Sequence, residues 1–367
     1  MTGSGNYSYI PITGLAKAGD VFLGESHMSQ DEFNDSQKMV DGRYHKTTLI
    51  HELGHAVGLG HPFEDYTNNH ANITYSKANG HGAEHTSLAY SVMSYAENVG
   101  DVSPDGYHNS YHMPTTLMMD DIATLQFLYG VNERYNDGDT TYRLSSFSTR
   151  DYIYACIWDG GGIDTFSWSD LITKANIDLG AGSFSFFGDI TCLDDDDLAT
   201  RNGLSAGDGL LGIAYDCLIE NATGGSANDI LTGNALDNLL QGGHGDDVLI
   251  GLAGGDTFTG GVGNDRFVLE LSSAARGKDA VTDFASGDKI RIDTANGNET
   301  TLTALQNAAD IRWTNTTNEA TGSTNNAGTN DTVIYWKNNT VTTSDDEIVM
   351  VLEDYTTALT MTDFEIV

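Results

Sequence analysis

The chain has few basic residues, with 17 Lys and Arg against 53 Asp and Glu, which gives a formal net charge of −36. A protein this acidic repels phosphate backbones, so nucleic-acid binding is excluded as its main function. The chain also lacks a long uninterrupted apolar run, and we therefore expect no membrane span. Met1–Ile10 has neither a basic region nor an apolar stretch, so no Sec-type signal peptide is expected there.

Cysteine is scarce as well, and its three copies, Cys156, Cys192 and Cys217, make an odd number. At least one thiol therefore has no partner within the chain, which excludes a disulfide framework. Their spacing contains no CxxC pair, so a thiolate metal site is not expected either. We interpret the three cysteines as small, mostly buried apolar residues.

The composition changes along the chain. Residues 1–135 hold ten of the 11 histidines, whereas the chain from Asn136 onward is rich in Gly, Asp, Asn and Thr, with short apolar pieces of strand length. This contrast predicts an α+β domain over 1–135 followed by an all-β domain over 136–367. In the first domain we expect strands at Asn6–Ile12 and Asp20–Leu23 and helices at Thr47–Val57 and Thr115–Tyr129.

Turn and cap residues refine the two helices. Gly58 and Gly130 are expected to end them, and Thr115 or Thr116 is expected to cap the second. Asp120 and Asp121 lie near the start of that helix, where paired carboxylates favour a structural role over acid–base chemistry.

The motif HELGHAVGLGHP has the spacing of a catalytic metal site. His51 and His55 lie four residues apart, so on a helix they share one face and can bind the same ion. Gly58 lets the chain reverse, so that His61 approaches from another side. Three neutral imidazoles with one open coordination position are typical of catalytic zinc, and Glu52 lies within reach of a water molecule on that metal.

The stretch SVMSY, Ser91–Tyr95, follows this helix in the chain. A Met in a tight turn can form an apolar floor beneath three imidazoles, and the Tyr95 phenol could reach the metal or a developing oxyanion. After a zinc helix, the stretch is typical of the Met-turn of a metzincin. For the remaining histidines, His85 among them, we expect polar surface positions or local hydrogen bonds.

A nine-residue repeat runs from 224 to 268 in five units: GGSANDILT, GNALDNLLQ, GGHGDDVLI, GLAGGDTFT and GGVGNDRFV. Five units in register predict a parallel β-roll. We expect the side chains at position six to face the gap between turns: Asp229, Asn238, Asp247, Asp256 and Asp265. We expect those at position eight to form the core: Leu231, Leu240, Leu249, Phe258 and Phe267.

In their order along the chain, the zinc motif, the Met-turn, the helix DDIATLQFLYG and the glycine-rich nonapeptides resemble the serralysin-type secreted zinc metalloproteases of the metzincin clan, which carry RTX calcium-binding repeats. The resemblance runs from about Asn6 to the C-terminus. It implies one catalytic zinc ion held by His51, His55 and His61. It also implies that Glu52 is the general base and that Tyr95 is an additional zinc ligand, which swings away to stabilise the transition state.

Oxygen ligands from Asp and backbone carbonyls suit Ca²⁺ rather than zinc, and the resemblance implies several structural calcium ions between turns of the roll. Within the repeats, the residues that it implicates are Gly225, Ala227, Asp229, Asn238, Gly242, Gly243, His244, Gly245, Asp247, Asp256, Gly260, Val262 and Asp265. Before the repeats, they are Asn136, Gly138, Thr140, Asp159, Gly161, Gly162, Asp164 and Glu220. Because Asn238 replaces an aspartate, its site is expected to be weaker or differently filled.

The resemblance further implies a monomeric, extracellular endopeptidase that acts on proteins or peptides. Its domains would be a metzincin-like catalytic domain over 1–135, with an incomplete sheet, and a calcium-binding β-roll over 136–367. Export would use the type I secretion machinery, which reads an uncleaved C-terminal signal in the segment that ends DFEIV.

Only Met1–Ile50 precede the first zinc ligand here, whereas family members carry a much longer segment before it. A fragment, a misassigned gene start and a natively minimal domain all remain open. Two other functions remain open with them: a calcium-binding repeat protein whose protease part is inactive, and a calcium-dependent adhesin.

Overall fold

The computed structural model describes residues 7–8, 21–22, 44–62, 85, 87–95, 113–143, 154–170, 172–187, 210–270, 277–293, 311–317, 330–337, 346–352 and 359–366. The chain forms two compact units, which we describe separately. We call residues 1–137, 144–161 and 181–217 the head unit, and residues 138–143, 162–180 and 218–367 the roll unit. No described helix is long and apolar enough to cross a bilayer.

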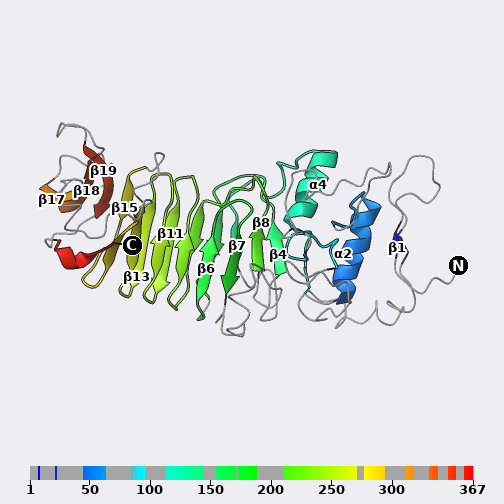
Figure 1. Cartoon of the computed structure of the whole chain (residues 1–367), viewed down its shortest axis with the longest axis horizontal. Coiled ribbons are helices and arrows are strands. Elements are labelled where there is room, and N and C mark those ends of the chain that lie inside the picture. Colours follow the sequence, from blue (N-terminus) through cyan, green and yellow to red (C-terminus); the bar gives the residue numbers. More distant parts are fainter. Residues whose placement is uncertain are drawn as a thin grey trace. The chain divides into compact units, whose positions relative to one another are not determined.

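The head unit contains the two helices, α2 (Tyr44–Ala56) and α4 (Met119–Tyr129) (Figure 1). Strands β1 (Tyr7–Ser8) and β2 (Val21–Phe22) form an antiparallel pair that lies inside the two ranges predicted for strands. Strand β8 (Leu210–Ile213) pairs antiparallel with β7 (Phe184–Phe187) and parallel with β4 (Tyr154–Ile157). Cys156 and Cys217 are buried free thiols, as expected, and Cys192 lies outside the described residues.

Both predicted helices exist, but their N-terminal boundaries were wrong. Helix α2 begins three residues before Thr47, whose buried hydroxyl donates to the Pro114 carbonyl at 2.8 Å. Helix α4 begins at Met119, and neither Thr115 nor Thr116 caps it. The cap is supplied by Asp121, whose carboxylate accepts the Met118 backbone N–H at 2.9 Å. A side chain within the first turn therefore sets this boundary, and the residues before it do not.

The roll unit is a stack of parallel strands (Figure 1). One sheet has the order β20-β16-β14-β12-β10-β6, and its neighbouring strands are all parallel. Its strands are β6 (Ala175–Asp178), β10 (Ile230–Thr232), β12 (Val248–Ile250), β14 (Arg266–Glu270), β16 (Lys289–Asp293) and β20 (Phe364–Ile366). The short 3-10 helix η6 (Met361–Asp363) precedes β20.

The second sheet of the roll unit has the order β17-β18-β19-β15-β13-β11-β9-β5-β3. It is parallel from β19 to β3, whereas β17, β18 and β19 are antiparallel neighbours. Its strands are β3 (Thr141–Arg143), β5 (Thr165–Ser167), β9 (Asn221–Thr223), β11 (Leu239–His244), β13 (Thr257–Val262), β15 (Asp279–Val281), β17 (Ile311–Thr317), β18 (Asn330–Lys337) and β19 (Asp346–Leu352).

The nonapeptides alternate between the two sheets, so each coil of the roll uses two of them. Leu231 pairs with Leu249 and Leu249 with Phe267 in one sheet, and Leu240 pairs with Phe258 in the other. All five of these position-eight side chains are fully buried. The parallel β-roll and its core, as predicted from the repeat, are confirmed.

Shortening one of these stacked side chains should therefore destabilise the roll. We expect Phe258→Ala to lower the free energy of unfolding by about 3–5 kcal/mol, because it removes buried apolar surface and leaves a cavity. Urea unfolding at fixed calcium concentration measures the change. Val262→Ala in the same strand is the control, since that side chain is 64% exposed. Equal effects of the two substitutions would contradict this description of the core.

Candidate functional site

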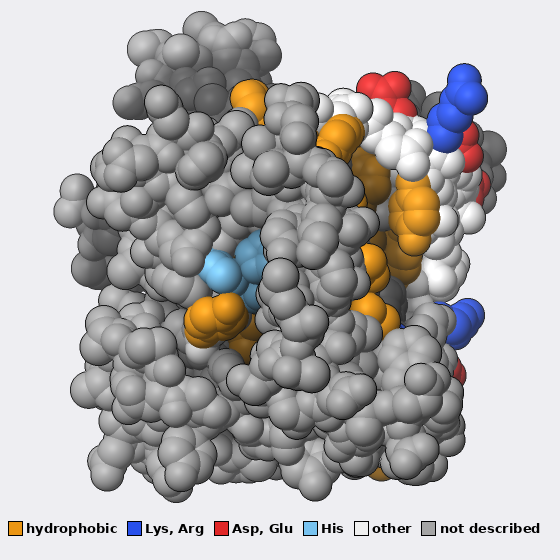
Figure 2. All heavy atoms as spheres, turned by 90° about the vertical axis from the view of Figure 1, so that its right-hand side faces the viewer, with side chains coloured by type: hydrophobic (Ala, Val, Ile, Leu, Met, Phe, Trp, Pro, Cys, Tyr) orange, Lys and Arg blue, Asp and Glu red, His pale blue; other side chains and the backbone are white. Residues whose placement is uncertain are grey.

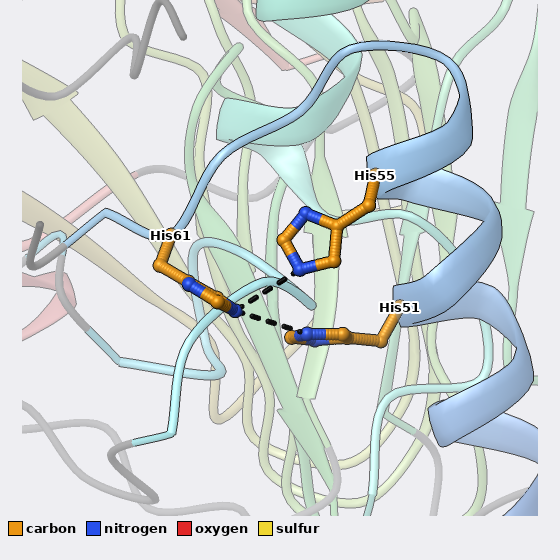
Figure 3. A group of neighbouring side chains, drawn as sticks. All are labelled: His51, His55 and His61. Atoms are coloured by element: carbon orange, nitrogen blue, oxygen red, sulfur yellow. Dashed lines mark hydrogen bonds between the residues drawn. The ribbon is translucent and has the colours of Figure 1, made fainter. Parts of the chain in front are cut away.

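Three histidine side chains converge in the head unit (Figure 3). His51 and His55 project from α2, and His61 comes from the loop that follows. The His61 Nε2 atom lies 3.0 Å from Nε2 of His55 and 3.2 Å from Nε2 of His51. One ligand atom from each residue lies within 4.8 Å of the other two, a spacing at which one ion could contact all three.

The end of α2 brings the third histidine back toward the first two. The Leu59 N–H donates to the Gly54 carbonyl at 2.9 Å, and the Gly58 N–H donates to the His55 carbonyl at 3.0 Å. These two bonds form a Schellman motif, in which Gly58 takes a positive φ of 106°. Gly58 therefore ends the helix as predicted, and the reversed chain carries His61 toward the helix.

Backbone carbonyls orient two of the imidazoles. Nδ1 of His51 lies 2.9 Å from the Val92 carbonyl, and Nδ1 of His55 lies 2.8 Å from the Leu59 carbonyl. Because a carbonyl only accepts, each Nδ1 carries the proton and each Nε2 keeps its lone pair. Burial, and next the neighbouring His55, lower the pKa of His61 to about 4. All three rings are therefore suited to bind a cation at neutral pH.

The turn at Ser91–Tyr95 packs against α2. The Ser94 N–H donates to the Ser91 carbonyl at 3.1 Å, which closes a tight turn around Met93. The Met93 side chain is buried, and its sulfur lies 2.6 Å from the position that a Cβ on Gly54 would occupy. Only glycine at position 54 allows the helix and the turn to approach this closely.

Asp121 holds this turn in place. Its buried carboxylate accepts hydrogen bonds from the Ser91 hydroxyl at 2.7 Å and from the Val92 N–H at 2.8 Å, besides the one from Met118. The same Val92 peptide unit orients His51 through its carbonyl. Burial, and to a smaller degree the nearby Asp120, raise the pKa of Asp121 to about 7, although its hydrogen bonds oppose the shift.

Tyr95 and Glu52 complete the group. The Tyr95 hydroxyl lies 2.9 Å from His61 Nε2, the atom that also faces the other two rings, and its ring stacks on His51 at 5.6 Å. Glu52 is buried on α2 next to His51. Figure 2 shows histidine side chains reaching the surface in a hollow of one face, with hydrophobic side chains beside them.

The sequence did not indicate a second buried polar group of the head unit. His85 is buried, and its Nδ1 lies 2.9 Å from Asp120 Oδ2, while the Tyr215 hydroxyl donates to Asp120 Oδ1 at 3.1 Å. The expectation of a surface or local role for His85 was therefore wrong. The structural role expected for Asp120 and Asp121 is confirmed. The partners of Asp120 lie 35 and 95 residues away, so no local pattern could have revealed them.

In the roll unit, the position-six side chains form ladders. The Oδ1 atom of Asp247 accepts the backbone N–H of Asp229 at 2.7 Å, and that of Asp265 accepts the N–H of Asp247 at 2.9 Å. In the other row, Asp256 Oδ1 accepts the N–H of Asn238 at 2.8 Å. Position-six residues two repeats apart therefore lie on neighbouring coils, and each carboxylate links two successive coils.

The second oxygens of two of these carboxylates suit a cation. Among the described residues, the buried Oδ2 atoms of Asp247 and Asp256 have no hydrogen-bond partner. Burial is the largest cause that raises the pKa of Asp247 to about 8 and those of Asp256 and Asp265 to about 6. A buried carboxylate oxygen without a donor is costly, and a hard cation is the partner that it fits.

The residues of the repeats whose carbonyls the resemblance implicates as calcium ligands lie where successive coils touch. The Gly225 carbonyl accepts the His244 N–H at 3.1 Å, and the Val262 carbonyl accepts the Gly245 N–H at 2.8 Å. At the other glycines of this set a Cβ would overlap the neighbouring coil or its aspartate. The positions with such contacts are Gly242 with Asp247, Gly243 with Gly225, Gly245 with Ala227, and Gly260 with Asp265.

The ladder also extends on both sides of the repeats. Before them, the Thr140 N–H donates to Asp164 Oδ1 at 2.8 Å, and the Asp164 N–H donates to Glu220 Oε2 at 2.7 Å. The predicted Gly138 carbonyl accepts the Thr140 hydroxyl, and Gly162 packs on Gly138 with a φ of 136°. Three further residues of the predicted loop lie in the head unit: Asn136, Asp159 and Gly161. There the buried Asp159 accepts the Gly161 N–H at 2.9 Å.

After the repeats, two rungs that the sequence did not reveal continue the ladder. Asp279 Oδ1 accepts the Asp256 N–H and Asp288 Oδ1 accepts the Asp265 N–H, both at 3.0 Å. Their spacing is 23 residues rather than 18. The signal that could have found them is the strand alternation in DAVTDFASGDKIRID, with an aspartate as the first residue of β15 and another directly before β16.

Comparison with known proteins gives the family. Residues 127–364 match the family model described as Peptidase M10 serralysin C terminal. The chain belongs to this family. The resemblance to serralysin-type metalloproteases and the β-roll of the C-terminal part are therefore confirmed.

The relatives of this serralysin family member include Serralysin B of Dickeya chrysanthemi, which is 36% identical over 212 residues, or 54% of this chain and 39% of that protein. Metalloprotease AprA of Pseudomonas entomophila is 38% identical over 203 residues, 52% of this chain and 37% of that protein. Serralysin of Photorhabdus luminescens is 32% identical over 242 residues, 63% of this chain and 44% of that protein. The matches thus span less than half the length of these relatives.

Proposed function

We propose that the protein is a secreted zinc-dependent endopeptidase whose β-roll is stabilised by calcium. The observation that carries the proposal is the convergence of three imidazole Nε2 atoms with the Tyr95 hydroxyl. The donor set fits zinc, because both helix histidines have their Nδ1 protons directed to carbonyls, so that each Nε2 presents its lone pair toward the cluster. His51, His55 and His61 would hold the ion, with Tyr95 as an additional ligand.

Zinc would supply Lewis-acid activation of water at neutral pH. The chain's own residues would do the rest. A carboxylate oxygen of Glu52 accepts a proton from the attacking water and passes it to the leaving amine nitrogen. Tyr95, which is 42% exposed and so accessible to substrate, donates a hydrogen bond from its hydroxyl to the developing oxyanion. The turn fixed by Asp121 keeps His51 in its orientation throughout.

Within this proposal, residues 1–135 form the metzincin-like catalytic domain and residues 136–367 form the calcium-binding roll. Asp229, Asp247, Asp256 and Asp265, with the glycine-rich carbonyls, are the proposed calcium ligands of the repeats, and Asp164 and Glu220 are the proposed ligands before them. At a net charge of −36, bound calcium would also relieve self-repulsion. Millimolar extracellular calcium suits such sites, which supports folding of the roll outside the cell. We further propose protein or peptide substrates, export by a type I route and a monomeric state.

Zinc removal tests the proposal. We expect the chain refolded with Zn²⁺ and Ca²⁺ to hydrolyse casein. Treatment with 1,10-phenanthroline in calcium-containing buffer should abolish hydrolysis, and added Zn²⁺ should restore it. Circular dichroism before and after treatment controls for unfolding. A folded, zinc-loaded chain without hydrolysis would reject the enzyme and leave a calcium-binding protein.

A further inference from the structure

Asn238 occupies the one position-six site of the five repeats that lacks a carboxylate, and its contacts differ from those of its neighbours. Its Oδ1 atom accepts the Asn234 N–H at 2.8 Å, and its Nδ2 atom donates to the Glu220 carbonyl at 2.8 Å. The amide orientation is fixed by both contacts, because a flipped amide would place NH₂ against N–H and oxygen against a carbonyl.

Asn234 lies in the same turn between β10 and β11, and we call such a turn between two strands a corner of the roll. Its Nδ2 atom donates to the Ile219 carbonyl at 2.8 Å and to the Leu179 carbonyl at 3.1 Å, while its Oδ1 atom accepts the Leu236 N–H at 2.9 Å. The two side chains also contact each other, with Asn238 Nδ2 3.1 Å from Asn234 Oδ1. Two neutral amides thus satisfy three backbone carbonyls of the preceding coils.

The corresponding corner one coil later is built differently. Asp256 lies 18 residues after Asn238 in the same row, and its buried Oδ2 atom has no hydrogen-bond partner among the described residues. A cation bound at this oxygen would take the place of a hydrogen-bond donor and would neutralise the carboxylate. At Asn238, by contrast, two side-chain NH₂ groups point at the carbonyl oxygens where a cation would have to bind, and there is no side-chain charge for a cation to neutralise.

We propose that the corner formed by Asn234 and Asn238 takes no calcium and is closed by the protein itself. The inference rests on the proposed calcium function of the other corners, and it departs from the ligand set that the nonapeptide pattern implies for Asn238. The amide pair joins the 175–180 and 219–224 segments to the repeats with bonds that persist when calcium is absent. It is a calcium-independent clasp at the start of a calcium-dependent array.

The number of bound calcium ions tests this proposal. Equilibrium dialysis of the full chain at saturating calcium should give the same number for Asn238→Ala as for the unaltered protein. Asp256→Ala, the matched variant, should bind one ion fewer. In calcium-free buffer, Asn238→Ala should lower the folding equilibrium constant of the roll by about ten- to hundredfold, because buried carbonyls lose their donors.

The outcomes separate the two ideas. A loss of one calcium ion in Asn238→Ala would overturn the clasp and make Asn238 an ordinary ligand. No loss in either variant would reject the calcium site at Asp256, and an unaltered chain that binds no calcium would reject the proposed calcium function. Asn238→Asp gives a second readout if the alanine variant does not fold. It should make the roll less stable without calcium and enlarge the rise in melting temperature on calcium addition, whereas an unchanged rise would contradict the clasp.

Discussion

Glu52→Gln is expected to lower casein hydrolysis by about 10²–10⁴-fold while zinc binding is unchanged. The amide matches the carboxylate in size, so the buried position on α2 stays filled. It cannot accept a proton from water at neutral pH, and the step assigned to Glu52 is lost. Hydrolysis at saturating casein, with zinc content measured on the same sample, gives the result.

Glu133→Gln is the matched control, because it makes the same chemical change on an exposed carboxylate of the head unit. Its activity should equal that of the unaltered chain. If Glu52→Gln retained full activity with zinc bound, Glu52 would not be the general base. If it lost zinc as well, the side chain would instead be needed to build the metal site.

Calcium removal is expected to make the stability of the roll unit fall as the pH rises from acidic to neutral values. The folded-state pKa values of Asp247, Asp256 and Asp265 are raised above the ordinary 3.8, to about 8, 6 and 6. The folded chain therefore binds protons more tightly than the unfolded chain between about pH 4 and pH 8. Stability from these groups is fully present below about pH 4 and is lost as the pH rises through those values. One unit of raised pKa corresponds to about 1.4 kcal/mol, so the total loss is on the order of several kcal/mol.

Thermal unfolding of the zinc-free chain in EGTA, followed by circular dichroism from pH 5 to pH 8, measures this loss. The melting temperature should fall as the pH rises, and several millimolar calcium should restore most of it at pH 8. Asp247→Asn should flatten the pH dependence in EGTA and reduce the calcium effect. Asp170→Asn, which removes the charge of an exposed side chain of the roll unit outside the ladder, should change neither. A melting temperature in EGTA that stayed constant or rose toward pH 8 would refute the assignment.

The repeat predicted the roll well because periodic sequence and periodic structure have the same cause. Position eight must be apolar in every unit because its side chain is buried in the core, and position six must offer an oxygen to the coil before it. The ladder residues Asp279 and Asp288 escaped prediction because their spacing departs from 18 residues. The backbone pairing continues through them nonetheless, since strand register does not depend on the length of the intervening turn.

The cluster of His51, His55 and His61 could be predicted because a helix and one glycine turn place the three residues within a short segment. What the sequence could not supply was the support around them. Asp121 reaches Ser91 and Val92 across about 30 residues, and His85 reaches Asp120 across 35. The predicted start of the second helix was wrong for a related reason. Asp121 caps its own helix at Met118, so the threonines before it do not set the boundary.

The ladder of carboxylates gives the roll two unlike ends. Each position-six N–H is satisfied by a side chain from the coil that follows it, as in Asp247 to Asp265 and Asp265 to Asp288. Removing a coil at the C-terminal side leaves a backbone N–H of the new end without its side-chain acceptor, whereas removing one at the opposite side leaves a carboxylate without its backbone donor. The array is thus directional. If the coils fold one after another from the C-terminal side, each new coil meets a carboxylate that can accept its position-six N–H.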